Sequence, residues 1–193
     1  MSPDTPPTLE TDRLLLRLPE ERDLDDWAAF LADPETTRFI GGVKCRAGAW
    51  RAMASFVGCW ALRGFGLLTV IEKESGRWAG YVGPWYPEGW PGHEIAWSIA
   101  PAFQRRGYAV EAAAACMDWA FDALGWSAVV HCIEPGNVAS VAVARKLGSG
   151  PLGRQAVLPP FDVTVDLYGQ SRQEWSRHRG ALRSARAPGP GPE

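Results

Sequence analysis

The chain has 193 residues, of which 46% are hydrophobic and 22% charged, and its formal net charge is −2. This length suits one domain with its own core, and the charge balance argues against nucleic acid or an anionic membrane as the main partner. The four cysteines form no C-x-x-C pair and no histidine is spaced to complete a zinc site, so we expect no metal. No signal pattern or long apolar run is present, and we expect a cytoplasmic protein.

Hydrophobic periodicity alternates along the chain between the two-residue repeat of strands and the 3.6-residue repeat of helices. Strand patterns cover residues 11–18, 67–72, 78–86, 94–100, 127–133, 155–158 and 163–168. Helical patterns cover residues 19–31, 46–62, 109–124, 137–147 and 171–179. This order predicts an α+β fold with a mixed, mostly antiparallel sheet of six or seven strands and helices on both faces.

The two ends of the chain differ from the rest in composition. Residues 1–8 are rich in Pro and Thr, and we expect them to be flexible. Residues 181–193 hold few apolar side chains and end in Ala-Pro-Gly-Pro-Gly-Pro-Glu, which predicts disorder. A single domain is therefore expected over residues 9–180.

The most informative segment lies between an expected strand and the helix expected at 109–124. Gly107 and Ala109 are small, so the backbone can approach a ligand closely. The N–H groups of the loop and the positive end of the helix favour an anion such as a pyrophosphate, beside the charges of Arg105 and Arg106. A capped helix with a solvated arginine pair is the alternative, and neither a Walker loop nor a dinucleotide fingerprint is present. The segment runs Gln104-Arg105-Arg106-Gly107-Tyr108-Ala109.

A second motif follows about thirty residues later, and the two together carry a resemblance. It runs Glu134-Pro135-Gly136-Asn137-Val138-Ala139-Ser140 and continues into Ala144-Arg145-Lys146-Leu147-Gly148. With Gln104-x-x-Gly107-x-Ala109 in front of it, the chain resembles the GNAT superfamily of acetyl-CoA-dependent N-acyltransferases. The opening residues are similar to the bacterial Rim-type branch, the ribosomal-protein N-terminal acetyltransferases: Leu9-Glu10-Thr11-Asp12-Arg13-Leu14-Leu15-Leu16-Arg17.

The resemblance implies a site for acetyl-CoA. The sheet is expected to splay beside the strand before the loop, and the backbone near Ser98 and Ile99 to pair with the pantetheine arm. The loop from Gln104 to Ala109, with Arg105, Arg106, Gly107 and Tyr108 between them, would hold the pyrophosphate. Three residues of the second motif would face the cofactor: Asn137, Ser140 and Arg145. Relatives also suggest a homodimer.

The chemistry of acetyl transfer to an amine needs a base, donors for the acyl oxygen and a hydrogen bond to the leaving sulfur. Glu94 is our candidate base, because the Rim-type branch often has an acid at this place. His131 and His93 compete with it, although a lone histidine in an apolar strand is more often a core residue. Ser140 is the candidate donor to the sulfur, since no tyrosine occurs between Tyr108 and Tyr168. A backbone N–H near Ile99 would serve the acyl oxygen.

Aromatic residues gather before the cofactor loop. Trp85 and Trp90, with Glu94 and His131, are our candidates for binding the acceptor, and ordinary core packing is the alternative. We expect an N-acetyltransferase that moves an acetyl group by direct attack of a primary amine, on a protein N-terminus or a small molecule. A non-catalytic acyl-CoA-binding module and a general nucleotide-phosphate protein are the other hypotheses, the last weakened by the lack of a Mg²⁺-binding carboxylate beside the loop.

Overall fold

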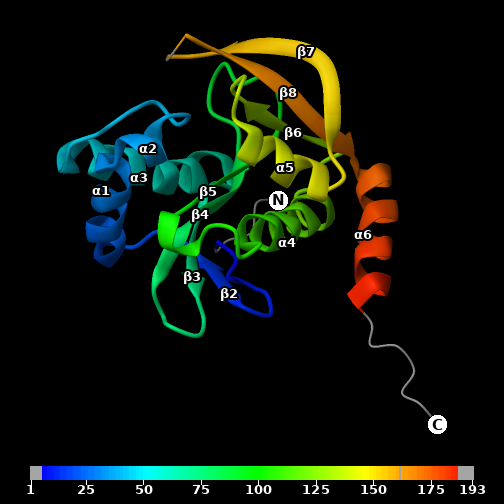
Figure 1. Cartoon of the computed structure of the whole chain (residues 1–193), viewed down its shortest axis with the longest axis horizontal. Helices are drawn as coiled ribbons and strands as arrows, with labels where there is room; N and C mark the ends of the chain where they lie inside the picture. The colour runs from blue at the N-terminus through cyan, green and yellow to red at the C-terminus, as the bar shows by residue number, and fades with distance from the viewer. Residues whose placement is uncertain (1–5, 161, 187–193) are drawn as a thin grey trace.

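Residues 6–160 and 162–186, which the computed structural model describes, fold around an eight-stranded sheet (Figure 1). Its strand order is β1-β2-β3-β4-β5-β6-β8-β7. Neighbouring strands are antiparallel except β5 and β6, which are parallel. The strands are β1 (Leu9–Glu10), β2 (Leu14–Arg17), β3 (Leu68–Glu72), β4 (Trp78–Trp85), β5 (Glu94–Ile99), β6 (Ala128–Ile133), β7 (Gly150–Leu158) and β8 (Val163–Ser171).

This architecture confirms the predicted α+β fold, but the described sheet has one strand more than the six or seven expected. The difference arises at the start of the chain, where a turn separates β1 from β2 and lets Leu9 pair with Leu16. β7 is also longer than the expected 155–158, because it begins at Gly150. It contains Pro151, which an edge strand tolerates, since one side of such a strand needs no donors.

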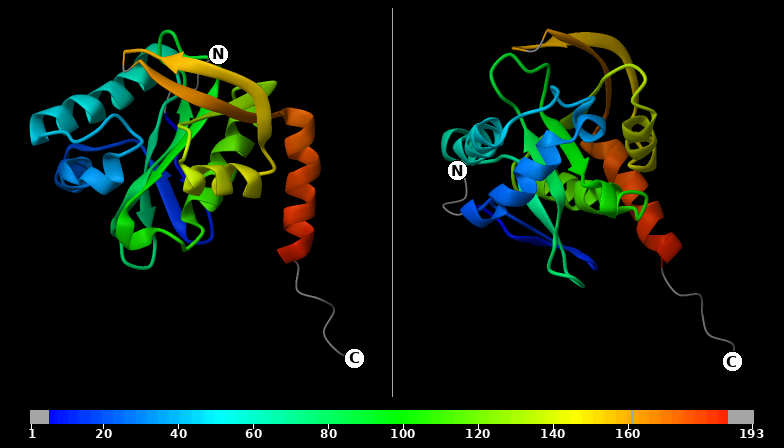
Figure 2. Two further views of the ribbon diagram at one scale, coloured as in Figure 1. Left: turned by 45° about the horizontal axis from the view of Figure 1, so that its top comes forward. Right: turned by 60° about the vertical axis from the view of Figure 1, so that its left-hand side comes forward.

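Helices cover both faces of the sheet (Figure 2). α4 packs on β4 and β5, with α5 beside it, while α1, α2 and α3 form the layer on the other face. No described helix is long and apolar enough to span a bilayer. The helices are α1 (Leu24–Ala32), α2 (Pro34–Thr37), α3 (Arg46–Arg63), α4 (Tyr108–Asp122), α5 (Val138–Lys146) and α6 (Arg172–Arg186), with 3-10 turns η1 (Glu21–Asp23) and η2 (Pro101–Phe103).

α6 is longer than the helix expected at 171–179 and includes residues 181–186 of the expected tail. Two of its basic residues pair with acidic residues of α4. Arg172 pairs with Asp122 at 3.1 Å and Arg179 with Asp118 at 2.9 Å, so α6 is tied to α4. Residues 1–5 and 187–193 of the two expected flexible ends lie outside the described part of the chain.

Two apolar clusters hold the layers together. Under α4, strand residues such as Leu14 and Ile95 pack against Met117 and Phe121. Under α1 and α3, Trp27 is fully buried and stacks on the Tyr81 ring at 4.6 Å. The central strands are thus packed on both faces, so residues that they carry are held in fixed positions.

The sheet opens between β5 and β6. These strands share the single register pair Glu94↔Val130, whereas β4 and β5 stay paired from Trp85↔Glu94 to Gly80↔Ile99. Beyond Glu94 the outer edge of β5 therefore has no strand beside it. The backbone N–H and C=O groups of successive residues point alternately to the two neighbours of a strand. Those of Trp97, and the N–H of Ile99, therefore point away from β4 and toward this opening. The splay expected at the cofactor strand is confirmed.

Candidate active site

A cavity of about 480 Å³ lies where the sheet opens. One side is the end of β5, with Ser98 and Ile99, and the loop that leads into α4. α5 forms a second side. The third side comes from the α1–α2 segment, through residues such as Phe30 and Phe39, which no sequence motif singled out. The end of β5, the loop before α4, and α5, which were expected around the cofactor, all border this cavity.

The loop that borders the cavity has an unusual backbone. Arg105 has φ 63° and Gly107 has φ 83°, both in the left-handed region, with Arg106 between them. Alternation of this kind turns successive N–H groups toward one concave side, which suits an anion. The first turn of α4 adds its own unpaired N–H groups and the positive end of its dipole. The Gln104 side chain ties the loop to β5 by donating to the Ile99 carbonyl at 2.9 Å.

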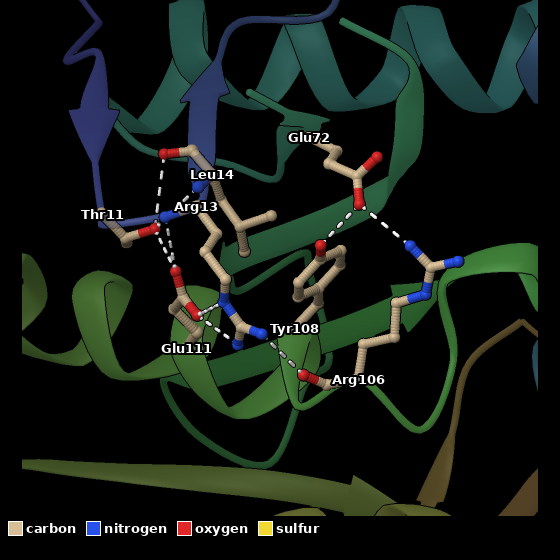
Figure 3. Close-up of polar contacts among 7 residues, drawn as sticks. All are labelled: Thr11, Arg13, Leu14, Glu72, Arg106, Tyr108 and Glu111. Carbon is tan, nitrogen blue, oxygen red and sulfur yellow. Dashed lines mark hydrogen bonds and ion pairs between the residues drawn. The ribbon is translucent and has the colours of Figure 1, made fainter. Parts of the chain in front are cut away.

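The side chains of Arg106 and Tyr108, both predicted at the cofactor, point toward Glu72 of β3 (Figure 3). Arg106 pairs with Glu72 at 3.1 Å, and the Tyr108 hydroxyl donates to the same carboxylate. The bonds from Ser75 and Tyr108, with Arg106 close by, keep the pKa of Glu72 below its ordinary value. A direct role of the Arg106 side chain stays a prediction.

The basic residues that border the cavity are a different set, and one acidic residue, Glu35, borders it as well. Arg105 borders it from the loop and Lys146 from α5, while Arg145, the residue singled out from the motif, is exposed and lies outside the lining. On a helix, residues three or four apart share a face, and Ser140, Val143 and Lys146 all border the cavity, whereas Arg145 does not. We therefore consider Lys146 the better candidate for a phosphate contact.

The second motif forms the N-terminus of α5. Asn137 caps the helix, because its Oδ1 accepts from the Ser140 N–H at 3.1 Å, and its amide nitrogen is the atom that can donate into the cavity. Trp97 Nε1 donates to Ser140 Oγ at 3.3 Å. With its oxygen held in this way, the Ser140 hydroxyl can direct its own proton into the cavity, which both residues border.

Glu94 lies where β5 and β6 part and is only 5% exposed. Its Oε1 accepts from the Cys132 N–H at 2.9 Å and its Oε2 from Trp90 Nε1 at 2.6 Å. Burial raises the pKa of this carboxyl to about 7, against the opposing effect of the two hydrogen bonds. Trp90 also contacts Trp85 with ring centroids 6.4 Å apart, so three of the predicted acceptor residues lie together.

The raised pKa of Glu94 predicts how stability depends on pH. Between pH 4.5 and about 7 the unfolded chain loses this proton while the folded chain keeps it, so folding is weakened as the pH rises through that window. At about 1.4 kcal/mol per unit, the cost above pH 7 is about 3 kcal/mol. We expect Glu94→Gln, which does not titrate, to gain unfolding free energy relative to the native chain between pH 5 and pH 8. Urea unfolding of both proteins at the two pH values measures this, and an unchanged difference would contradict it.

His131, the fourth predicted acceptor residue, lies on the opposite face of the sheet and is 1% exposed. Its Nδ1 is 2.8 Å from the Ile95 carbonyl, and its Nε2 is 2.9 Å from Ser149 Oγ. A carbonyl can only accept, so Nδ1 carries the proton and Nε2 accepts from Ser149, which itself accepts from Gln170 Nε2 at 2.8 Å. Burial lowers the pKa of His131 to about 4, so the ring is neutral. The imidazole bridges the splayed strands, and Ser149 and Gln170 complete a buried hydrogen-bond chain that sequence reasoning missed.

The chain is similar in sequence to known proteins. Residues 13–149 match the family model described as "Acetyltransferase (GNAT) domain". The uncharacterized protein YkkB of Bacillus subtilis is 34% identical over 148 residues, 72% of this chain and 83% of that protein. The chain therefore belongs to the GNAT acetyltransferase family.

Solved structures agree with this assignment. The crystal structure of an acetyltransferase from Agrobacterium tumefaciens superposes with a TM-score of 0.74 at 30% identity, over 86% of this chain and 95% of that one. An aminoglycoside acetyltransferase, AAC(6')-Ib, solved in complex with coenzyme A, has a TM-score of 0.72 at 18% identity, over 86% of this chain and 99% of that one. At that identity the second likeness shows the fold alone.

Proposed function

We propose that the protein is an acetyl-CoA-dependent N-acetyltransferase that acetylates a primary amine by direct attack. The observation that carries this is the left-handed loop of Arg105 and Gly107 opening onto the cavity beside the unpaired edge of β5. The acceptor is a protein N-terminus or a small amine. The similarity of residues 9–17 to the Rim-type branch keeps a protein N-terminus in the set, but fold and cofactor are shared across acceptor classes and do not choose among them.

The residues present suit acetyl-CoA. The N–H groups of the loop, with Arg105 and Lys146, would hold the pyrophosphate, since helix N-termini and fixed cations both favour phosphate. The edge of β5 near Ser98 and Ile99, with the Asn137 amide, would hold the pantetheine arm. Acetyl-CoA supplies the activated acetyl group, and the chain needs only to position it and move protons.

The proton movements fall to two side chains. Glu94, with a pKa near 7, is ionised in a large fraction of molecules at neutral pH and would take a proton from the amine, directly or through a water. The Ser140 hydroxyl would donate a hydrogen bond to the leaving sulfur, because Trp97 already occupies its oxygen. A β5 N–H near Ile99 would donate to the acyl oxygen.

Calorimetric titration with acetyl-CoA tests the cofactor site. We expect the native chain to bind and Gly107→Glu to lose at least about tenfold in affinity, because the substitution places a side chain at φ 83° and a negative charge beside the phosphate position. Gly125→Glu is the matched control: its φ is 68°, nothing lies within 4 Å of its added Cβ, and it follows the far end of α4. This control should bind as the native chain does.

The outcomes separate the three hypotheses. Absence of binding by the folded native chain would reject an acetyl-CoA site and with it the proposed function. Binding without thiol release across a library of amines would favour the non-catalytic module instead. Competition by ATP or NAD at similar concentrations would favour a general phosphate-binding loop.

A further inference from the structure

A network of polar and charged residues lies beside the cofactor loop (Figure 3). Arg13, in the turn between β1 and β2, donates from Nε to Glu111 Oε2 at 2.7 Å. Glu111 belongs to the first turn of α4 and also accepts from Thr11 Oγ1 at 2.6 Å and from the Arg13 N–H at 3.0 Å. Burial opposes ionisation of Glu111, but these hydrogen bonds outweigh it and lower its pKa, so the network is an ion pair.

The guanidinium of Arg13 has one more contact, and it reaches the loop itself. Its NH1 donates to the Arg106 carbonyl at 3.0 Å, and its centre lies 4.7 Å above the Tyr108 ring. The Arg13 guanidinium thus contacts the Glu111 carboxylate, the Arg106 carbonyl and the Tyr108 ring at the same time. A planar guanidinium with several N–H donors can do this, and a lysine ammonium cannot. The first turn of the chain is thereby joined to residues almost a hundred positions later.

The carbonyl that Arg13 holds belongs to the peptide between Arg106 and Gly107. In a trans peptide the C=O and N–H groups point in opposite directions. Holding the Arg106 oxygen on Arg13 therefore aims the Gly107 N–H away from Arg13, and Gly107 borders the cavity. A positive charge at the oxygen also polarises the peptide and makes its N–H a stronger donor.

The loop conformation needs such a restraint. Arg105 is a residue with a side chain at φ 63°, a conformation that sterics disfavour, and Gly107 is free to leave φ 83° because it has no side chain. A Cβ added at Gly107 would meet only Arg13 NH2, at 3.6 Å. Little else is packed against Gly107 itself, and the hydrogen bond from Arg13 holds the peptide that precedes it.

We propose that Arg13 is a positioning residue for the cofactor: held by Glu111, it orients the Arg106–Gly107 peptide so that the Gly107 N–H meets the pyrophosphate. This inference rests on the proposed function. Arg13 acts through the peptide and does not itself touch the ligand. Its effect should therefore be confined to ligands that carry the pyrophosphate.

The test compares two probes, acetyl-CoA and S-acetylpantetheine, which lacks the pyrophosphate, by titration of tryptophan fluorescence. We expect Arg13→Ala to raise the dissociation constant for acetyl-CoA about tenfold and leave that for S-acetylpantetheine unchanged. Arg13→Lys keeps a cation beside Glu111 but lacks the fork, so it should behave the same way if the alanine variant folds poorly. Lys73→Ala is the matched control, because Lys73 also pairs with a carboxylate and donates to a backbone carbonyl, Thr11 O at 2.8 Å, without touching the loop. The ratio of the dissociation constants for acetyl-CoA and S-acetylpantetheine should be the same in this control variant as in the native chain.

Two results would overturn the inference while the proposed function stood. The first is native-like acetyl-CoA affinity in both folded Arg13 variants. The second is equal weakening of both probes, which would mean that Arg13 supports the fold and not the loop. Failure of the native chain to bind acetyl-CoA would instead reject the proposed function, so the two failures are distinguishable.

Discussion

Glu94→Gln should lower kcat/KM for an amine acceptor by about 10²- to 10³-fold, the usual contribution of a positioned base. The acetyl-CoA dissociation constant should not change, because Glu94 lies at the start of β5, away from Ser98 and the loop. Glutamine has nearly the same shape and still accepts from the Cys132 N–H, but its amide nitrogen loses the bond from Trp90 Nε1, so unchanged acetyl-CoA affinity is the check that the rest of the site is intact. Thiol release at saturating acetyl-CoA measures it.

The pH profile identifies the same group independently. With a pKa of about 7, Glu94 becomes ionised as the pH rises, so kcat/KM of the native chain should climb through pH 7 and then level off. This rise of kcat/KM through pH 7 (the acid limb of the profile) should be absent in Glu94→Gln. Glu88→Gln is the control, since Glu88 is a fully exposed carboxylate of the loop that leads into β5 and its contact with Arg63 is 3.4 Å long. A limb that survives in Glu94→Gln would assign the base to another residue.

The cofactor loop could be predicted because its signals are local. The signals are Gly107, Ala109 and the start of the apolar stripe of α4, which lie within a few positions of one another. Each of them affects the backbone conformation at its own position. Gly107 does take the left-handed conformation at the N-cap of α4. The direction of the Arg106 side chain could not be predicted, because its partner Glu72 is 34 positions away.

The contacts missed by sequence reasoning are mostly long-range ones. Arg13 and Glu111 are 98 positions apart, and nothing in the spacing of either residue indicates the other. His131 was predicted to bind the acceptor, with a core histidine as the alternative, and neither interpretation indicated its contact with the Ile95 carbonyl across the opening of the sheet. The early part of β7 was missed for a different reason: Pro151 and Gly153 break the strand pattern, and only the edge position of the strand makes them acceptable.

Glycines show the same limit. In the sequence, Gly76 and Gly80 look alike, since both lie near a turn between two strands. In the structure Gly76 is open to space, whereas a Cβ on Gly80 would be 2.1 Å from the Ser98 carbonyl oxygen. Packing therefore requires a glycine only at Gly80, which lies against β5, the strand that borders the cavity.

Gly80→Ala should consequently lower the unfolding free energy by about 4 kcal/mol, because it combines a strained φ with a clash against backbone that cannot rotate aside. The φ of Gly80 is 142°, and its neighbours are Ser98 and Ile99 of β5. The substitution must push β4 and β5 apart at the place where Ser98 and Ile99 border the cavity. We therefore expect acetyl-CoA affinity to fall as well, even in the fraction that remains folded.

Gly76→Ala separates strain from clash. Its φ is 66° and it has no neighbour within 4 Å, so it should cost only the backbone strain, about 1 kcal/mol, and leave acetyl-CoA affinity unchanged. Urea unfolding and calorimetric titration of the two variants measure both effects on the same turn. Equal unfolding midpoints would mean that β4 and β5 lie farther apart at Gly80 than described. A large loss of stability with native affinity would mean that the β5 edge does not carry the cofactor, because the clash with the Ser98 carbonyl on the β4 side must shift β5, and with it the backbone groups of Trp97 and Ile99 that face the opening.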